Sequence, residues 1–314
     1  MFISCQSIPL DSIKLSTDWN LHPWEFGVIP KDLQKSFALN GVIHPPLAIA
    51  DSDKTFVIVS GARRIEFIRR SIGASQIDCM VIDKDAPPSF ILNLVLADQS
   101  SAFELSLAEK ARFIEIASRL LKKEEVAATF LGKLQLKKGR STIPNLLDIL
   151  RQDGKIIKEI HAGRIQERMV SEILSLPEEA DRLALVQLFI NLGMGNSKQK
   201  RFFNLIRDIA FRNGSSISSF LQKKEITEIL DHKDMNIPQK IHHLGSLLQH
   251  EINPTSSLAE VAFAKQVNSL NLPENHSISH SPSFEKNDIT LSITFKNFAD
   301  CEQYLSQQKK AFIN

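Results

Sequence analysis

The chain has 314 residues, of which 43% are hydrophobic and 24% are charged. This length and composition are typical of a globular protein with two or three domains. The sequence contains no run of the roughly 18–20 apolar residues that a transmembrane helix needs. Its first residues lack the basic start of a secretory signal. We therefore expect a cytoplasmic protein with no membrane partner.

The charges are nearly balanced, with a formal net charge of +2. Composition alone therefore does not indicate a nucleic-acid-binding protein, and a DNA-binding surface would have to come from local clusters of basic residues. The three cysteines, Cys5, Cys79 and Cys301, lie far apart and show no paired spacing. This pattern favours reduced thiols over disulfides or a cysteine metal site.

The first 95 residues have the pattern of a small domain that mixes helices and strands. A Pro-Pro pair at 45–46 precedes the first predicted strand, and a glycine follows each predicted helix. The predicted elements are helices at 31–39 and 62–72 and strands at 47–50, 55–59 and 77–82.

From about residue 88 to residue 250, apolar residues recur at helical intervals. Ser106, followed three residues later by Glu109, predicts a capping box at the start of a helix over 105–121. Further helices are predicted over 124–131, 142–150, 153–160, 165–175, 180–191, 198–212, 217–230 and 238–250.

The C-terminal part begins with a polar, linker-like segment at 272–287. Residues 289–295 then alternate apolar and polar side chains, which predicts a half-buried strand, and a helix is expected over 297–311. One strand and one helix bury too little surface to be stable alone. They must pack either on the rest of the chain or on a second copy, and the sequence leaves both alternatives open.

The segment Ser-Gly-Ala-Arg-Arg at 60–64 lies where a predicted strand ends and a helix begins. Gly61 allows the backbone to approach a ligand closely, and the free N–H groups of the first helical turn favour anions. Arg63 and Arg64 strengthen that preference because guanidinium groups bind phosphate through two hydrogen bonds. The alternative is that these arginines form ordinary ion pairs with acids such as Glu66.

A second loop, Asn-Gly-Val-Ile-His-Pro-Pro at 40–46, is rigid and leaves its backbone groups free to bind a planar base. His44 in this loop is either a ligand or an ordinary loop histidine.

Two short predicted helices, 124–131 and 142–150, are joined by a basic connection in the order of a helix-turn-helix. Ser141 is the expected N-cap of the second helix, and Thr142 and Asn145 would meet base edges. The alternative is a helical hairpin with a solvated basic loop. Four basic residues would contact phosphates and set the register on DNA: Lys133, Lys137, Lys138 and Arg140.

The two loops, followed in order by the helix-turn-helix, resemble the ParB/RepB partition family over about residues 5–175. In that family the first loop contacts the cytosine base of CTP and the second contacts its triphosphate. The resemblance also implies double-stranded DNA as a partner, a homodimer and a partition ATPase. The nucleotide-binding residues that it implies are His44, Pro45, Gly61, Ala62, Arg63 and Arg64.

The sequence departs from the family pattern at two places. Ala62 stands where the family has a glutamate used in hydrolysis, and a methyl group cannot orient water. At the family's Mg²⁺-binding motif the sequence reads Asp-Gln-Ser-Ser-Ala, in which Asp98 still offers a hard oxygen ligand. The resemblance therefore implies CTP binding with weak or absent hydrolysis, and Mg²⁺ at Asp98.

The sequence thus predicts an α+β protein that is nucleoid-associated and binds DNA under the control of CTP. Two other functions stay open: an enzyme on the same fold, either a nuclease or a nucleotide phosphotransferase, and a transcription regulator without a role in partition. The expected segments are a ParB-like nucleotide-binding domain (1–95), a helix-turn-helix domain (96–175), a helical region (176–271), a linker (272–287) and a C-terminal strand–helix (288–314).

Overall fold

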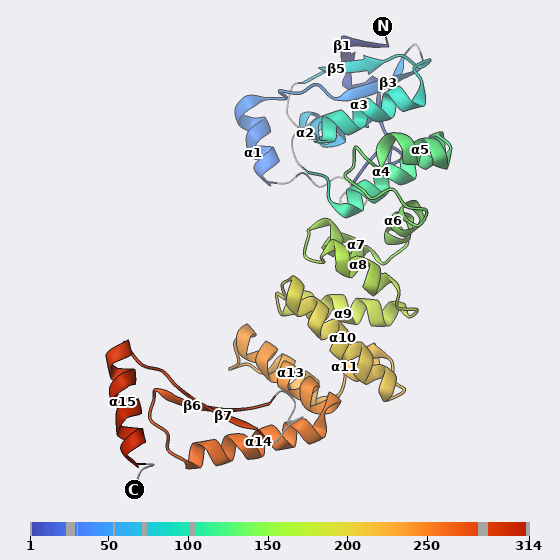
Figure 1. The fold of residues 1–314 in the computed structure, drawn as a ribbon. Helices are drawn as coiled ribbons and strands as arrows, with labels where there is room; N and C mark the ends of the chain where they lie inside the picture. The colour runs from blue at the N-terminus through green and yellow to red at the C-terminus, as the bar shows by residue number, and fades with distance from the viewer. Residues whose placement is uncertain are drawn as a thin grey trace. The chain divides into compact units, whose positions relative to one another are not determined.

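The computed structural model describes residues 2–22, 29, 31–52, 54–70, 74–100, 104–281 and 288–311. The chain forms two compact units, Met1–Lys200 and Arg201–Asn314. The first unit contains a five-stranded sheet and a series of helices, and the second is helical with a two-stranded sheet near the C-terminus (Figure 1). The predicted α+β fold class is confirmed.

The five strands of the first unit form one mixed sheet in the order β1–β5–β3–β4–β2. Strand β1 (Ile3–Pro9) pairs antiparallel with β5 (Gln76–Ile82), which runs parallel to β3 (Leu47–Ser52). Strand β3 pairs antiparallel with β4 (Thr55–Ser60), and β2 (Ile13–Leu15) lies parallel to β4. The sequence predicted β3, β4 and β5 but neither edge strand.

The two edge strands were not predicted because their sequences show little alternation of apolar and polar residues. In β1 only Ile8 is buried, and most of its other side chains are exposed. Strand β2 has only three residues. An edge strand is held by the backbone hydrogen bonds of its neighbour, and that pairing leaves no local signal in the sequence.

Helices cover both faces of the sheet at strand β4. Helix α2 (Ala62–Arg70) packs Ile65 against one face, and helix α3 (Pro88–Ser100) contacts β4. Neighbouring residues of a strand point to opposite faces, and Ile58 and Val59 are each only 2% exposed. The end of β4 is therefore held from both sides.

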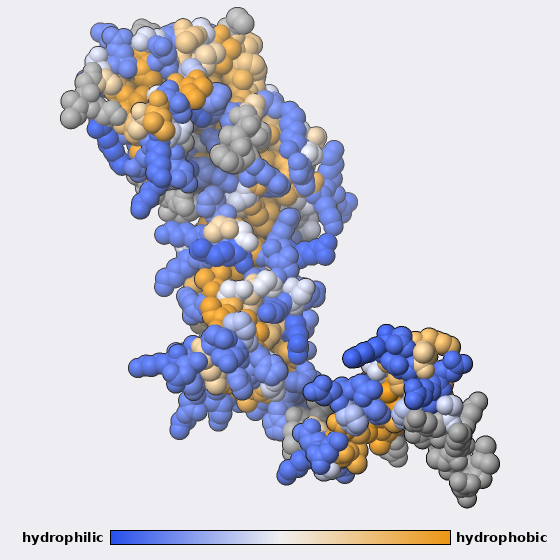
Figure 2. Space-filling model, turned by 90° about the vertical axis from the view of Figure 1, so that its left-hand side faces the viewer, coloured by the Kyte–Doolittle hydropathy of each residue, from blue (hydrophilic) through white to orange (hydrophobic). Residues whose placement is uncertain are grey.

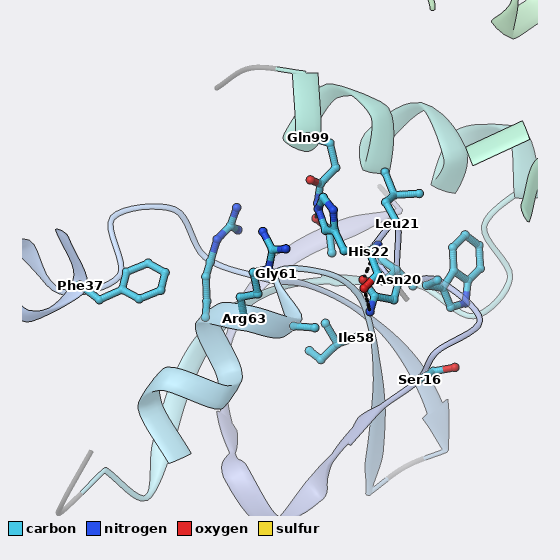
Figure 3. Close-up of a pocket in the computed structure, with 14 residues that line it drawn as sticks. Ser16, Asn20, Leu21, His22, Phe37, Ile58, Gly61, Arg63 and Gln99 are labelled. Atoms are coloured by element: carbon cyan, nitrogen blue, oxygen red, sulfur yellow. Dashed lines mark hydrogen bonds between the residues drawn. The ribbon is translucent and has the colours of Figure 1, made fainter. Parts of the chain in front are cut away.

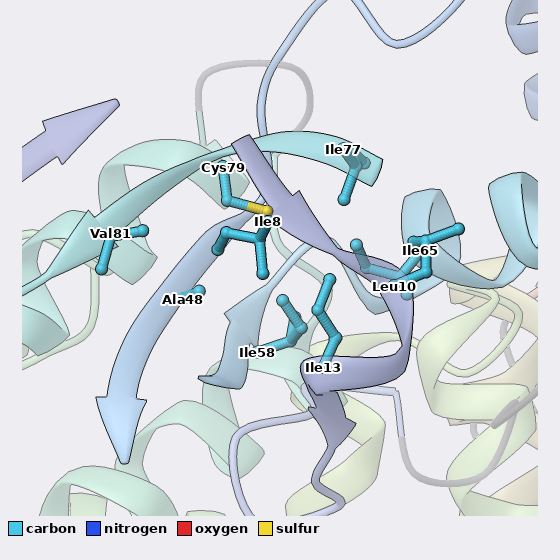
Figure 4. Close-up of a cluster of buried hydrophobic side chains, with 9 residues drawn as sticks. All are labelled: Ile8, Leu10, Ile13, Ala48, Ile58, Ile65, Ile77, Cys79 and Val81. Carbon is cyan, nitrogen blue, oxygen red and sulfur yellow. The ribbon is translucent and has the colours of Figure 1, made fainter. Parts of the chain in front are cut away.

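A cluster of buried apolar side chains lies between the sheet and α2 (Figure 4). Arg69 joins α2 to the segment between β1 and β2, since its Nη2 donates to the backbone oxygens of Leu10 at 3.2 Å and Ile13 at 2.6 Å. The cluster draws apolar residues from all five strands, the turn after β1 and α2: Ile8, Leu10, Ile13, Ala48, Ile58, Ile65, Ile77, Cys79 and Val81.

Helix α1 (Lys31–Asn40) ends at the glycine that the sequence predicted as its stop. Gly41 has a left-handed backbone, with φ +68°, and its N–H donates to the backbone oxygen of Phe37 at 2.9 Å. The ring of Phe37 packs against Phe67 of α2 at 4.9 Å between centroids. The predicted stop of α2 at Gly73 lies outside the described residues.

Helix α4 (Leu107–Leu120) is the centre of the helical part of the first unit. It contacts α5 (Lys123–Phe130), α6 (Thr142–Leu150) and α7 (Gly154–His161). Helix α8 (Glu167–Leu174) packs on α6. The two helices that the sequence predicted for a helix-turn-helix are present as α5 and α6.

The predicted capping box of α4 is present. Ser106 Oγ accepts from the Glu109 backbone N–H at 3.2 Å, and the Glu109 carboxylate accepts from the Ser106 N–H at 2.7 Å. The predicted side-chain cap of α6 is wrong, because Ser141 has helical backbone angles and makes no capping hydrogen bond. Thr142 Oγ1 instead donates to the backbone oxygen of Lys137 at 2.9 Å, so the connection folds back onto the helix start.

The remaining helices follow the predicted pattern with two differences. The single helix expected over 217–230 is two helices, α11 and α12, and a helix that the sequence did not predict, α14, follows α13. Their bounds are α9 Glu179–Asn191, α10 Asn196–Arg212, α11 Ile217–Leu221, α12 Lys224–Asp231, α13 Ile237–Ile252 and α14 Pro254–Ser269.

The predicted linker contains a strand. Strand β6 (His276–His280) pairs antiparallel with β7 (Ile289–Ile293), and helix α15 (Phe298–Ala311) follows. Ile278 is the only aliphatic residue of β6, so its pattern gave no strand signal. Strand β6 is stabilised by its pairing with β7.

Strand β7 is more exposed than the alternating sequence predicted. Ile289 is 65% exposed and Leu291 is 54% exposed, so the expected half-buried strand is not half-buried within this chain. Hydrophilic residues cover most of the face shown in Figure 2, and hydrophobic side chains interrupt them in several places. The alternation in β7 therefore marks a face that the single chain leaves open.

The three cysteines are free, as predicted. Burial raises the pKa of the Cys79 thiol to about 12, which makes it an unreactive part of the core. Among the described residues, no helix combines the length and apolar character that crossing a membrane requires.

Candidate functional site

A pocket of about 180 Å³ opens where β4 ends and α2 begins. Its walls come from the loop after β2, from Phe37 of α1, from the turn between β4 and α2, and from the end of α3. Figure 3 shows Asn20, His22 and Gln99 around the turn that carries Gly61. The pocket thus lies at the turn that the sequence predicted to bind phosphate.

Gly61 brings the two predicted loops together. Its φ of +90° is one that other residues rarely adopt, and a Cβ at this position would lie 3.0 Å from the Cβ of Pro46. No side chain fits there without displacing the Pro-Pro loop. The glycine is therefore required both by its backbone angle and by the close approach of Pro46.

Arg64 binds the backbone of the same Pro-Pro loop. Its Nη1 donates to the backbone oxygens of His44 at 3.3 Å and Pro45 at 3.4 Å. The His44 side chain is exposed, and neither His44 nor Pro45 lines the pocket. In this structure the carbonyl groups of the loop face a guanidinium group, so they hold Arg64 in place.

Asp98 of α3 completes the same network. Arg64 Nη2 donates to its two carboxylate oxygens at 3.3 and 3.4 Å, and the Ser60 hydroxyl donates to one of them. Gln99 Nε2 in turn donates to Ser60 Oγ at 2.7 Å. The carboxylate that the sequence assigned to Mg²⁺ is thus used to connect α3 to the turn, and it does not fit a metal ligand as it stands.

Arg63 and Ala62 line the pocket beside Gly61. Glu66, the acid that the sequence offered as an ion-pair partner for the arginines of the turn, pairs instead with Arg70 farther along α2, at 3.5 Å. Among the described residues that line the pocket, none carries a carboxylate. Arg64 is paired with Asp98 behind the wall, so the positive charge that the lining offers an anion is that of Arg63.

His22 forms part of the pocket wall and is neutral at physiological pH. Burial, followed by the nearby charges of Arg63 and His161, lowers its pKa from 6.5 to about 3. Its Nδ1 lies 3.1 Å from Glu109 Oε1, and its ring lies 5.7 Å from that of His161. The sequence gave no sign of this group, because residues 22, 109 and 161 are brought together only by tertiary packing.

Arg112 of α4 anchors the loop that carries His22. Its Nε donates to the backbone oxygen of Asn20 at 3.0 Å, and its Nη2 donates to that of Thr17 at 2.7 Å. Glu115 holds the same guanidinium group on its other side. The pocket wall is thus attached to the helical part of the first unit.

The second candidate site is the exposed start of α6. The connection before it is ordered: Leu134 is 2% exposed, and Gln135 has a φ of +58°. Lys133 is exposed and is tied to α3, since its Nζ donates to Asn93 Oδ1 at 2.5 Å. Five of the predicted DNA-contacting residues are exposed around this helix start: Lys137, Lys138, Arg140, Ser141 and Asn145.

Comparison with known proteins supports the family resemblance. No family model matches the chain. The nucleoid occlusion protein of Lysinibacillus sphaericus (strain C3-41), a ParB-family protein, is 22% identical over 160 residues. The match covers 50% of this chain and 50% of the relative, so the chain spans about half the length of the curated relative that it matches.

Three solved structures show looser similarity. C-terminally truncated ParB from Caulobacter crescentus complexed with CTP-gamma-S is 17% identical, covers 60% of this chain and 99% of its own, and has a TM-score of 0.24. The same protein complexed to the centromeric parS site is 14% identical, covers 63% of this chain and 98% of its own, and has a TM-score of 0.36. A Pnob8-like ParB-N domain is 15% identical, covers 76% of this chain and 97% of its own, and has a TM-score of 0.32. TM-scores below 0.5 do not establish a shared fold. The family resemblance is therefore supported by the sequence match to the nucleoid occlusion protein.

Replacing Gly61 by alanine is expected to destabilise the first unit more than replacing Gly41. Both glycines have a positive φ, and strain of this kind costs about 1–3 kcal/mol. Only at position 61 would the new Cβ also meet Pro46. Urea denaturation followed by tryptophan fluorescence measures this, since Trp19 lines the pocket together with Gly61. Equal losses in Gly61→Ala and Gly41→Ala would contradict the role given to the Pro46 contact.

The free energy of unfolding of the first unit is expected to fall as the pH drops from 6.5 toward 3. The folded protein keeps His22 neutral in this range, whereas the unfolded chain binds a proton there, so acid favours unfolding. The slope from this one group is at most about 1.4 kcal/mol per pH unit. His22→Gln should remove that share of the slope in urea titrations between pH 4.5 and 6.5 in chelator-treated buffer. Parallel curves for the two proteins would refute the assignment.

Proposed function

We propose that this chain, a divergent ParB-like protein, binds duplex DNA through helices α5 and α6 and the connection between them. The observation that carries the proposal is the exposed start of α6, where Asn145 and Ser141 stand beside three exposed basic residues of the connection. A recognition helix meets DNA with this end. The match to a nucleoid occlusion protein supports the same function.

The residues around the start of α6 would have different roles in DNA recognition. Lys137, Lys138 and Arg140 would contact phosphates and set the position on the duplex. The Asn145 amide can both donate and accept hydrogen bonds, which suits the edge of an adenine. Thr142 is bound to the backbone of Lys137, so we assign it to shaping the connection.

We also propose that the pocket binds the phosphates of a nucleotide, and the family resemblance implies CTP. The N–H groups of the first turn of α2 and the guanidinium group of Arg63 supply the positive charge. A pocket of about 180 Å³ is smaller than typical ligand pockets, which span roughly 300–1,000 Å³. It therefore suits the phosphates, with the nucleoside lying toward the exposed loop that contains His44.

In this proposal the nucleotide acts as a ligand that regulates DNA binding and is not turned over. Ala62 lines the pocket and has no group that could orient water. Asp98 would have to release Arg64 and Ser60 before it could hold Mg²⁺, so no step is assigned to the metal. A nuclease or phosphotransferase would need carboxylates at the pocket, and the described lining residues provide none.

A homodimer joined through the C-terminal strand is the proposed assembly. The exposed Ile289 and Leu291 of β7 would be covered by a second copy across a two-fold axis. From the family resemblance we further propose a place at the nucleoid and a partition ATPase as partner. A transcription regulator would use the same DNA-binding residues, and a cognate ATPase that binds this chain would favour partition.

The double variant Lys137→Ala/Arg140→Ala is expected to weaken DNA binding and to lower its dependence on salt. Each lost phosphate contact reduces the slope of log affinity against log salt by about 0.9, so two contacts give about 1.8. Fluorescence anisotropy with a labelled duplex between about 50 and 200 mM salt measures both effects. Lys200→Ala is the matched control, because Lys200 pairs with Glu172 at 2.9 Å. Absence of binding by the parent protein even at low salt would refute the DNA-binding proposal.

Replacement of Arg63 by alanine is expected to weaken CTP binding by at least about tenfold, since a charge-assisted phosphate contact contributes about 1.5–3 kcal/mol. Calorimetric titration with CTP, ATP and GTP, with and without DNA, measures affinity and base preference. Arg70→Ala is the control, because Arg70 is paired with Glu66 at the far end of α2. Equal loss in both variants, or no nucleotide binding by the parent, would count against the pocket. Phosphate release should stay at background.

A further inference from the structure

Three metal-ligating side chains converge beside the pocket, from parts of the chain that are far apart in sequence. His22 comes from the loop after β2, Glu109 from the first turn of α4, and His161 from the end of α7. We propose that these three residues bind one divalent transition-metal ion of the Zn²⁺ type. The proposal does not depend on whether the pocket binds a nucleotide.

The spacing of the ligand atoms fits a single ion. One ligand atom from each residue lies within 4.8 Å of the other two. His22 Nδ1 is 3.1 Å from Glu109 Oε1, and His161 Nδ1 is 3.9 Å from Glu109 Oε2. Bonds of about 2.0–2.2 Å in a tetrahedral site place neighbouring ligands roughly 3.3–3.5 Å apart. His22 Nδ1 and Glu109 Oε1 are already close to this spacing, and side-chain rotations that close the other gaps by at most about 1.5 Å would complete the site.

The donor set indicates the class of metal. Two imidazoles and one carboxylate are the ligands of many zinc sites that keep a fourth position for water, and they also bind Fe²⁺ and Co²⁺. Mg²⁺ and Ca²⁺ prefer oxygen ligands alone, so they are disfavoured here. Glu109 is 9% exposed and both histidines are partly buried, which shields the charges of the group from solvent.

The capping box of α4 supplies the outer support that metal ligands need. The Ser106 backbone N–H donates to Glu109 Oε2 at 2.7 Å, which orients the carboxylate while Oε1 faces His22. The Ser106 hydroxyl lies 2.9 Å from His161 Nδ1, and Nδ1 would give up this contact when it binds the metal. A hydrogen bond such as the one from the Ser106 N–H to Glu109 holds a metal ligand in position before the ion arrives.

A metal ion at this place would join the sheet to the helices of the first unit. His22 belongs to the pocket wall, whereas Glu109 and His161 belong to the helices around α4. The ion would also add positive charge next to the pocket and so favour an anion there. The alternative is a hydrogen-bonded His-Glu-His cluster that binds no metal, and the experiment below separates the two.

The test uses the full-length, tag-free protein, stripped of metal with a chelator and then titrated with Zn²⁺ in competition with a chromophoric chelator. The proposal predicts one tightly bound equivalent per chain. Glu109→Gln and His161→Ala should each weaken binding by at least about tenfold, whereas His44→Ala and His243→Ala, both outside the cluster, should leave it unchanged. Bound Zn²⁺ should also raise the Tm of the parent protein and not that of the two cluster variants.

Substitution with Co²⁺ keeps the proposal testable even if a cluster variant fails to fold. The parent protein should then show the strong visible absorption of four-coordinate cobalt with nitrogen and oxygen ligands. Absence of a tightly bound equivalent and of this absorption in the parent protein would overturn the proposal. The proposal would also be overturned if the His161→Ala variant is folded, as judged by circular dichroism, and still binds Zn²⁺ as tightly as the parent protein.

Discussion

The site depends on one guanidinium group, that of Arg64. It donates to two backbone oxygens of the loop at 44–45 and to the carboxylate of Asp98, so two segments, this loop and α3, are fixed to the first turn of α2. Its side chain is only 19% exposed, and a partly buried charge must be paired to be tolerated. Asp98 and the loop carbonyls meet that requirement. The same contacts hold Arg64 against the loop and α3, and Arg63 lines the pocket beside it.

The parts of the fold that local chemistry determines could be predicted from the sequence. The turn at Gly61, the helix stop at Gly41 and the capping box at Ser106 were found because each depends on residues within a few positions of one another. The central strands were found for the same reason, since a strand such as β4 carries four consecutive apolar residues, 56–59. The α+β class follows from these elements.

The parts that depend on distant partners could not be predicted. Strand β6 is held by β7, and its own sequence is mostly serine and histidine. The sequence foresaw that an arginine of the turn could form an ion pair and named Glu66 as the acid. That acid pairs with Arg70, while the partner of Arg64 is Asp98, 34 residues away. Nothing in the spacing of residues 22, 109 and 161 indicated that they meet.

The hold of Arg112 on the loop at 17–20 has a practical consequence for dissecting the protein. A fragment that ends near residue 95 would retain all five strands of the sheet, and it would look from its sequence like a complete module. It would lack the guanidinium group that fixes one wall of its cavity, because that group belongs to α4. Shortened versions of the chain should therefore extend at least through α7, so that the wall and its anchor are produced together.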